Sequence, residues 1–401
     1  MAKIDDSVKK KVPELRFKGF TDPWVQRNLA DLSDGFSYGL NAAAKEYDGV
    51  HGYLRITDID EVSHSFLPEG LTSPDVPENQ LTDYRMDEQS IVYARTGAST
   101  GKTYIYRDSD GELYYAGFLI RQKVNKETSA QFVYQNTLTK AWERYVQVMS
   151  QRSGQPGINA QEVGRFELTI PEKAEQDKIA HLFNSLDNLI AANQRKLDLL
   201  KEQKKGYLQK MFPKNGSKFP QLRFAGFADA WEQRKVSELA DRYDNLRVPI
   251  TASERVAGET PYYGANGIQD YVEGFTHNGE FVLVAEDGAN DLQNYPVQYV
   301  DGKVWVNNHA HVLQAKEERV DNKFLTNALK HTNIEPYLVG GGRAKLNADV
   351  MMKINFKVPT LPEQVQIGEF FDNLDHLITL HQRKLEKLQE LKKGYLQKMF
   401  C

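Results

Sequence analysis

The chain has 401 residues, of which 40% are hydrophobic and 26% charged, as in an ordinary globular protein with room for two or three domains. Its 51 basic and 55 acidic residues give a net charge of −4, so any DNA contact would need local basic patches or basic partners. The only cysteine is Cys401, which excludes an intramolecular disulfide. With a polar N-terminal stretch and no apolar run of about 20 residues, we expect a cytoplasmic protein without a membrane span.

Two copies of one unit make up the chain. The sequence Lys-Lys-Gly-Tyr-Leu-Gln-Lys-Met-Phe occurs at 204–212 and, unchanged, at 392–400. The opening at 13–20 returns with small changes at 220–227, an offset of 207 residues, and Trp-x-Gln-Arg follows at 24–27 and 231–234. Such repetition indicates internal duplication, so we expect two units of one fold whose differences carry the function.

Between the matching ends, short β-branched and aromatic runs alternate with Gly-rich turns. The runs at 91–94 and 103–106 in the first unit, and at 281–285, 297–300 and 304–306 in the second, predict strands. Short helices are expected at 129–145 and 321–331. This mixture indicates a compact α+β domain in each unit.

Both globular parts end alike. An Asn-Ala motif at 159–160 leads to Ile170 and Pro171, and one at 347–348 leads to Val358 and Pro359. The offset is now 188, against 207 at the openings, so the first unit is longer by the difference of 19 residues, at a place that the sequence does not reveal. We predict globular parts at 1–170 and 220–358, helical regions at 171–212 and 359–401, and a linker at 213–219.

A long, charged helical pattern follows each globular part. Its apolar residues come to recur at alternating steps of three and four, which is the seam of a coiled coil. Each helix could pack on its own domain, or the two could form an intramolecular antiparallel coiled coil, which we favour. Polar seam members, among them Lys204 and Lys392, would cost stability but fix the register. The other predicted seam residues are Ile190, Asn193, Leu197, Leu200, Tyr207 and Met211, and Ile378, His381, Leu385, Leu388, Tyr395 and Met399.

An antiparallel pair of helices would relate the two units by an approximate two-fold axis. The helix at 179–212 would be about 50 Å long at ~1.5 Å per residue. This length corresponds to about 15 base pairs of DNA at ~3.4 Å each. Such a rod would suit a divided target, with two unlike words separated by a fixed gap.

The order of these motifs resembles the specificity (S) subunit of type I restriction-modification systems, over essentially the whole chain. Besides the paired openings, the likeness rests on Glu-Gln-x-x-Ile after each boundary proline, at 175–179 and 363–367. In the helices, Leu-Asp-x-Leu-Ile and Gln-Arg-Lys-Leu recur at 186–190 and 194–197, and at 374–378 and 382–385. The duplicated order is far more specific than any single motif.

The resemblance implies two target recognition domains, each reading one half of a bipartite double-stranded DNA target. The helical regions would dock two modification (methyltransferase) subunits, with restriction subunits joining outside. S-adenosylmethionine, ATP and Mg²⁺ would belong to those partners, and this chain would be non-catalytic, with no bound cofactor or metal. In keeping with this expectation, the sequence contains no Asn-Pro-Pro-Phe or Asp-Pro-Pro-Tyr tetrapeptide and no recognisable nuclease carboxylate cluster.

In the first unit, the stretch 96–103 looks like a phosphate-binding P-loop. Thr96, however, replaces the first glycine, and a strand-like run follows where a P-loop needs a helix. The resemblance instead makes 95–101 a loop of the recognition domain, and a plain surface turn is the alternative. Side chains suited to phosphates or base edges are Arg95, Ser99, Thr100 and Lys102, with Arg152 and Gln155 before the Asn-Ala motif.

In the second unit, Glu286 and Asp287 stand in the comparable place. A carboxylate can accept a hydrogen bond from cytosine N4, so this difference could reflect a different DNA word. His309 and His311 share one strand face, but a metal site needs more ligands than the sequence shows nearby, so we favour hydrogen bonding in the fold or to DNA. The candidates here are Asn290, Asn307, Asn308 and His309, with Arg343 and Lys345 in a Gly-rich basic loop.

The sequence therefore predicts a non-enzymatic subunit for DNA recognition and assembly. Two other classes stay open. A stand-alone coiled-coil DNA-binding protein or repressor would need no methyltransferase partner. An ATP-binding protein using residues 97–103 would depend on Lys102.

Overall fold

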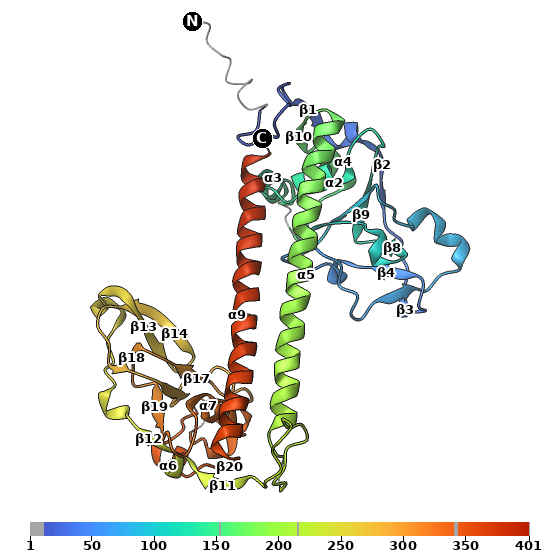
Figure 1. Cartoon of the computed structure of the whole chain (residues 1–401). Coiled ribbons are helices and arrows are strands. Elements are labelled where there is room, and N and C mark those ends of the chain that lie inside the picture. The colour runs from blue at the N-terminus through green and yellow to red at the C-terminus, as the bar shows by residue number, and fades with distance from the viewer. Residues whose placement is uncertain (1–11, 152–153, 215, 341–343, 401) are drawn as a thin grey trace, which may run out of the picture. The chain divides into compact units, whose positions relative to one another are not determined.

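The computed structural model describes residues 12–151, 154–214, 216–340 and 344–400, which form two compact units. The first unit comprises 1–192 and 384–401, and the second comprises 193–383. Two long unbroken helices, α5 (Lys173–Met211) and α9 (Leu361–Lys398), each give one half to each unit (Figure 1). The helical regions predicted from the sequence are confirmed, whereas each compact unit takes in halves of both helices. No helix among the described residues is long and apolar enough to cross a bilayer.

Each unit contains a four-stranded antiparallel sheet of the same topology. The strand order is β2-β9-β6-β7 in the first unit and β12-β19-β16-β17 in the second. The registers agree, because Ala94 pairs with Leu119, and Ala285 with Ala310, each 191 residues further on. The strands predicted for these sheets are confirmed. Their bounds are β2 (Ser33–Tyr38), β9 (Leu119–Val124), β6 (Ser90–Ala94) and β7 (Thr103–Ile105), and β12 (Ala240–Arg242), β19 (Ala310–Ala315), β16 (Phe281–Ala285) and β17 (Val297–Val300).

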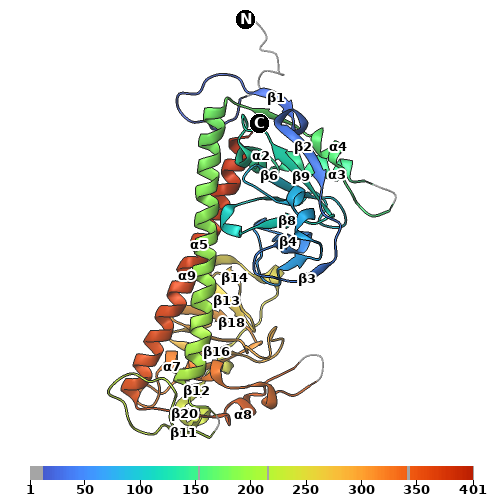
Figure 2. The ribbon, with the colours of Figure 1, turned by 90° about the vertical axis from the view of Figure 1, so that its right-hand side faces the viewer.

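A parallel strand pair lies next to the sheet in each unit, β4 with β8 and β13 with β18. Smaller antiparallel pairs are β1 with β10, β11 with β20, and β3 with β5. Figure 2 shows β11 and β20 near the end of α5 in the second unit. The bounds are β1 (Val25–Asn28), β3 (Ala44–Glu46), β4 (Gly52–Leu54), β5 (Thr72–Pro74), β8 (Leu113–Tyr115), β10 (Glu167–Ile170), β11 (Glu232–Lys235), β13 (Ala257–Gly264), β14 (Gly267–Val272), β15 (His277–Asn278), β18 (Lys303–Val306) and β20 (Asn355–Val358).

The short helices flank the sheets. The predicted helix at 321–331 is α7, but the one predicted at 129–145 is two helices, α2 and α3. The break follows from two threonines, because the hydroxyls of Thr137 and Thr139 donate back to the carbonyls of Tyr134 and Asn136 and compete with helix continuation. The bounds are α2 (Ala130–Asn136), α3 (Lys140–Met149), α4 (Ala160–Gly164), α6 (Val236–Leu239), α7 (Asn322–His331) and α8 (Ala348–Met351).

The matched strands locate the 19 extra residues of the first unit. The offset between equivalent residues is 207 at the start of β2 and β12 but 191 at the start of β6 and β16. Sixteen of the extra residues therefore lie between β2 and β6, in the segment that carries β3 and β5. The other three lie between β9 and α4, where α3 stands.

The repeated opening and the Glu-Gln motif bind each other in both units. Arg16 donates from Nε and Nη2 to the two carboxylate oxygens of Glu175, at 2.7 and 2.8 Å, and Arg223 does the same to Glu363 at 2.7 and 2.7 Å. Both glutamate side chains are fully buried. One residue earlier, the Leu15 N–H donates to the carbonyl of Lys398 at 2.8 Å, and its counterpart Leu222 donates to Lys210 at 2.8 Å. The repeated opening and the Glu-Gln motif therefore make the same contacts in both units.

The identical nine-residue sequence ends each helix inside a hydrophobic core. Phe400, at the end of α9, packs in the first unit against Phe132 and Phe183, with ring centres 5.4 and 5.6 Å away. Phe212, at the end of α5, packs in the second unit against Trp231 and Phe324 at 5.9 and 5.6 Å. Each helix therefore begins in one unit and completes the core of the other.

Within each unit, the halves of α5 and α9 pair in antiparallel directions. In the second unit, the Asn193 amide donates to the carbonyl of His381 at 2.8 Å, and Lys204 forms an ion pair with Asp375. In the first unit, Lys392 pairs with Asp187 at 2.7 Å, which is the same contact in the other copy. All fourteen predicted seam residues, Lys204 and Lys392 among them, are buried or half-buried. The antiparallel direction is confirmed, while the length of the rod and the placement of the globular parts on it stay predictions.

We expect Glu363→Gln to lower the free energy of unfolding of the second unit by about 3 kcal/mol, because it leaves the Arg223 guanidinium without its buried counter-charge. Urea unfolding of the full chain, with hydrogen exchange to assign the loss to a unit, measures this. The control is Glu369→Gln, an exposed position on the same helix, which should change stability by less than about 0.5 kcal/mol. Equal stabilities of the two variants would contradict a structural role for the pair.

Candidate nucleic-acid interface

Three loops meet at the end of β6 in the first unit. The loop from Arg95 to Lys102 joins β6 to β7. The Arg95 N–H donates to the carbonyl of Phe118 at 3.1 Å, and its carbonyl accepts from the N–H of Ile158 at 2.9 Å. Gly101 lies in the left-handed region, with φ of 88°, and its N–H donates to Ala94 at 2.8 Å, which closes the turn. These backbone bonds fix the start of the loop without using a side chain.

The second unit builds the same scaffold from different residues. Glu286 takes the position of Arg95, because its N–H donates to the carbonyl of His309 at 2.8 Å and its carbonyl accepts from Leu346 at 2.7 Å. A single β-bridge also matches, between Thr96 and Gly157 in the first unit and between Asp287 and Lys345 in the second. The comparable placement of the two loops, inferred from the sequence, is therefore confirmed.

In the first unit the scaffold presents a cation among aromatic and amide groups. The guanidinium carbon of Arg95 lies 5.0 Å from the ring centre of Tyr38, within cation–π range. Both residues line a pocket of about 450 Å³ with the exposed Gln155. Phe118, directly before β9, is 63% exposed and accepts the Arg95 N–H through its backbone carbonyl. Sequence reasoning found Arg95 and Gln155 but missed Tyr38 and Phe118, whose signal is an aromatic residue next to a glycine at a strand end.

The other candidates of this loop are engaged within the protein. Lys102 has only 5% of its side chain exposed, and its ammonium group donates to the carbonyl of Ile59 at 2.8 Å and to Glu61 at 2.7 Å. Ser99 donates to the same carboxylate at 3.1 Å, and Thr100 donates to the carbonyl of Gly97 at 2.7 Å. The P-loop interpretation fails on two points: the strand β7 follows the loop, and its lysine is already engaged. Arg152 lies outside the described residues.

A network of charges lies under the loop of the second unit. His311, 1% exposed, has Nδ1 2.7 Å from an Asp244 oxygen and Nε2 2.8 Å from the carbonyl of Leu346. Both partners are acceptors, so both hydrogen bonds form together only in the imidazolium. Arg247 and Lys345 reach Glu286 at 2.7 and 2.8 Å.

The pKa shifts follow this arrangement. Burial alone would raise the pKa of Asp244, but the hydrogen bond and charge of His311 outweigh it and lower the pKa. Burial would likewise raise the pKa of Glu286, yet hydrogen bonds from Lys345 and Arg247 lower it. The hydrogen bond to Glu286 raises the pKa of Lys345 in turn. Each group is thus held in its charged form.

Asp244, Glu286 and His311 offer three ligand atoms within 4.8 Å of one another, the one such group among the described residues. The cations of Arg247 and Lys345 already neutralise these carboxylates, and His311 directs both nitrogens to oxygen atoms. A divalent cation would have to displace these ion pairs. The chemistry of the group therefore favours a structural network over a metal centre.

The remaining candidates of the second unit are distributed above this network. His309 bonds to Asp287 through Nδ1, and its N–H donates to the side-chain oxygen of Asn307 at 2.8 Å. Asn307 is buried and caps this turn, whereas Asn308 and Asn290 are exposed. Lys345 is half-exposed beside Asp287. Arg343 lies outside the described residues.

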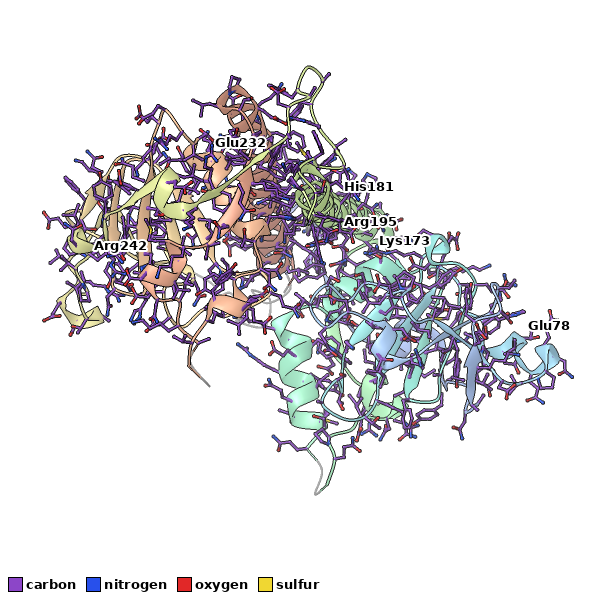
Figure 3. All side chains as sticks on the ribbon, turned by 90° about the horizontal axis from the view of Figure 1, so that it is seen from below. Glu78, Lys173, His181, Arg195, Glu232 and Arg242 are labelled. Carbon is purple, nitrogen blue, oxygen red and sulfur yellow. The ribbon has the colours of Figure 1, made fainter. Side chains whose placement is uncertain are left out.

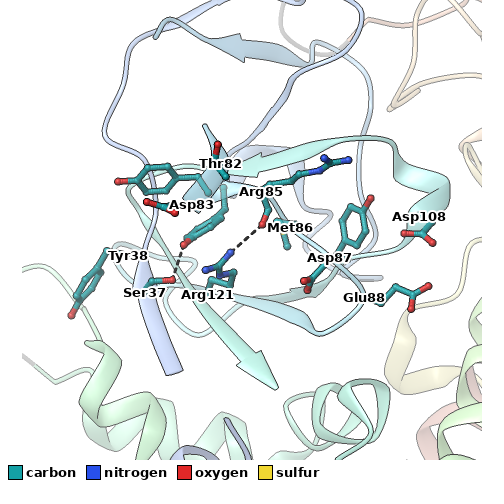
Figure 4. A pocket seen from close by; sticks show the side chains of 13 residues that line it. Ser37, Tyr38, Thr82, Asp83, Arg85, Met86, Asp87, Glu88, Asp108 and Arg121 are labelled. Atoms are coloured by element: carbon teal, nitrogen blue, oxygen red, sulfur yellow. Dashed lines mark hydrogen bonds between the residues drawn. The ribbon is translucent and has the colours of Figure 1, made fainter. Parts of the chain in front are cut away.

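A larger pocket of about 800 Å³ lies beside Tyr38 in the first unit (Figure 4). Arg121 stacks on Tyr115 at 5.0 Å and donates to the carbonyl of Arg85 at 3.0 Å. The carboxylates on its walls belong to Asp83, Asp87, Glu88 and Asp108. This acidic wall disfavours a phosphate backbone.

Charged side chains of both signs cover each unit (Figure 3). In the first unit, Glu78 projects from a turn, and Lys173 lies exposed at the start of α5. In the second, Glu232 and Arg242 lie on β11 and β12.

The profile of the family described as type I restriction modification DNA specificity domain matches residues 9–202 and 228–390. The chain therefore belongs to this family. A putative type I restriction enzyme specificity subunit of Haemophilus influenzae is 44% identical over 164 residues, which cover 41% of this chain and 42% of that relative. The putative MjaX specificity subunit of Methanocaldococcus jannaschii is 21% identical over 394 residues, covering 93% of this chain and 91% of the relative.

The fold has a solved counterpart. The crystal structure of a type I restriction-modification system S subunit from M. genitalium matches with a TM-score of 0.73 at 15% identity, covering 97% of this chain and 99% of that chain. The two α+β units and long helices thus have the fold that the sequence predicted. Together, the family and its relatives indicate a type I specificity subunit and do not favour a stand-alone repressor.

We expect Asp244→Ala to destabilise the second unit by about 2–4 kcal/mol, because it leaves the His311 Nδ1 and the Val312 N–H without their acceptor in a buried place. Urea unfolding with hydrogen exchange measures this in the full chain. Asp241→Ala is the control, since that exposed carboxylate of β12 pairs with Lys316 at 3.4 Å and should contribute less than about 1 kcal/mol. A loss no larger than the control's would refute the network's structural role.

Proposed function

We propose that, within a type I restriction-modification complex, each unit of this specificity subunit reads one half of a bipartite double-stranded DNA target. The supporting observation is one backbone scaffold that carries two different sets of side chains. Arg95 and Glu286 make the same backbone bonds yet have opposite charges. A duplicated fold with exchanged side chains at one loop suits two unlike words.

The side chains suggest different base contacts. An arginine can donate two hydrogen bonds to guanine O6 and N7, and Arg95 is a half-buried cation that lines the pocket beside its loop. Gln155 and Tyr38 lie beside it for base-edge or sugar contacts. In the second unit, Asp287 can accept from cytosine N4, with His309 bonded to it and Asn290 and Asn308 exposed nearby.

The paired helices would set the gap between the half-sites and dock methyltransferase subunits. They bury their seam but leave leucines about half exposed, including Leu189 on α5 and Leu377 on α9. These two occupy the same position in the repeat. Two equivalent apolar positions suit two copies of one partner.

Catalysis would belong to the partners. We assign S-adenosylmethionine to the methyltransferase subunits, and ATP and Mg²⁺ to restriction subunits that join outside. The specificity subunit would then be non-catalytic, bind no cofactor or metal, and act in the cytoplasm. Its acidic balance of 55 to 51 fits a chain whose attraction to phosphates comes partly from basic partners.

Mapping of methylated sites, in cells that carry the chain and its partner genes, tests the reading of DNA. We expect the wild type to give one bipartite sequence. Arg95→Ala should lower the preference for one base pair in one half by about 5- to 150-fold, as for the loss of a bidentate contact, and leave the other half unchanged. The exposed Arg144→Ala, on α3, is the matched control and should alter neither half. Loss of both halves together would argue against independent readers.

Co-purification and native mass spectrometry test the docking surfaces. Leu189→Lys or Leu377→Lys alone should reduce the bound methyltransferase from two copies to one, because each places a charge in one of two equivalent apolar contacts. The double variant should bind none. Asn188→Lys, exposed on the same helix turn, should keep both copies. Two bound copies on the double variant would rule out this surface.

A further inference from the structure

The lysine of the first unit's loop is bound by a turn in the segment between β2 and β6, which is 16 residues longer than its counterpart in the second unit. Lys102 donates to Glu61 and to the carbonyl of Ile59, and Ser99 donates to the same Glu61 carboxylate. One carboxylate thus joins two points of the loop. The hydrogen bond from Lys102 also lowers the pKa of Glu61, which keeps the carboxylate charged.

The turn that carries Glu61 has a second attachment. His64 is the one non-glycine residue with positive φ among the described residues, at 56°, and its Nδ1 lies 2.9 Å from the carbonyl of Thr103. Asp60 accepts from the N–H groups of Val62 and Ser63 at 3.1 and 2.6 Å and shapes the turn. The turn therefore contacts the loop at Lys102 and Ser99 through Glu61, and at Thr103, the first residue of β7, through His64.

The opposite side of the loop rests on α3. The indole N–H of Trp142 donates to the carbonyl of Gly101 at 2.9 Å. A Cβ at Gly101 would come within 2.6 Å of Val146, so the loop lies directly on the helix. The first unit is 16 residues longer between β2 and β6 and three longer between β9 and α4, where the second unit has a short 3₁₀ helix at 335–337 in place of α3. The loop is thus held on one side by the β2–β6 segment and on the other by α3.

We propose that Glu61, His64 and Lys102 form a loop clamp that positions residues 95–101 for one DNA half-site, and that Lys102 does not touch DNA. The proposal rests on the proposed function of the loop. Lys102 has 5% of its side chain exposed and holds two acceptors, so it is a positioning residue rather than a phosphate contact. Arg95 and its neighbours would keep their reading geometry only while the clamp is closed.

The experiment uses the complex of the full chain with its methyltransferase partners. Glu61→Ala and Lys102→Met are compared with Glu69→Ala, an exposed glutamate of the same inserted segment. In methylation mapping, we expect both clamp variants to lose about tenfold in discrimination within one half-site, the order of one mismatched base pair, with the other half and the control unchanged. An unchanged half-site in Glu61→Ala would overturn the proposal.

Salt dependence separates positioning from contact. A lysine on a phosphate adds about one to the slope of log affinity against log salt, so Lys102→Met should leave the slope as in the wild type. A slope smaller by about one, with the DNA word intact, would make Lys102 a phosphate ligand and refute the clamp. The Glu61 side chain is 69% exposed, so Glu61→Ala decides even where Lys102→Met fails to fold. A wild-type complex that methylates no bipartite sequence would instead refute the proposed function.

Discussion

A buried guanidinium–carboxylate pair closes each unit, Arg16 with Glu175 and Arg223 with Glu363. The glutamate belongs to the first turn of a long helix, and the arginine to the segment that covers the far end of the other helix. A charge without its partner in this place would cost several kcal/mol, so the joint ties the start of one helix to the end of the other. The identical Met-Phe ends then complete each core. This double joint explains why the repeated motifs cluster at the ends of the units.

The two loops depend on backbone hydrogen bonds rather than on a buried charged pair. Their shape depends on backbone hydrogen bonds that any residue can make, at Arg95 and Phe118 or at Glu286 and His309. Side chains at these positions are consequently free to change sign without loss of the scaffold. A fold built in this way places its stability in the buried ion pairs and cores, and leaves the loop side chains free to differ between the units.

The sequence predicted the parts of the structure that repetition and period reveal. Duplicated motifs gave the two units, and alternating steps of three and four gave helices whose polar pair, Asn193 and His381, lies in the antiparallel seam. The loops were predicted less well. From the sequence, Lys102 is predicted to be an exposed cation next to Gly101, because nothing local to it reveals Glu61, 41 residues earlier. The exposed Tyr38 was missed because its partner Arg95 lies on another strand connection. Both errors concern contacts between distant segments, which no single sequence displays.

The two units stabilise equivalent loops by unequal means. In the first, the turn that carries Glu61 and helix α3 hold a loop of eight residues between β6 and β7. In the second, a loop of eleven residues between β16 and β17 lies on the ion network of Asp244, Arg247 and Glu286. A loop transplanted without its support would therefore lose its shape, since neither Glu61 nor Arg247 is part of the loop it holds. If the loops read DNA as proposed, the module that carries a word is the loop together with its buried support, and new words would arise by exchange of whole globular parts.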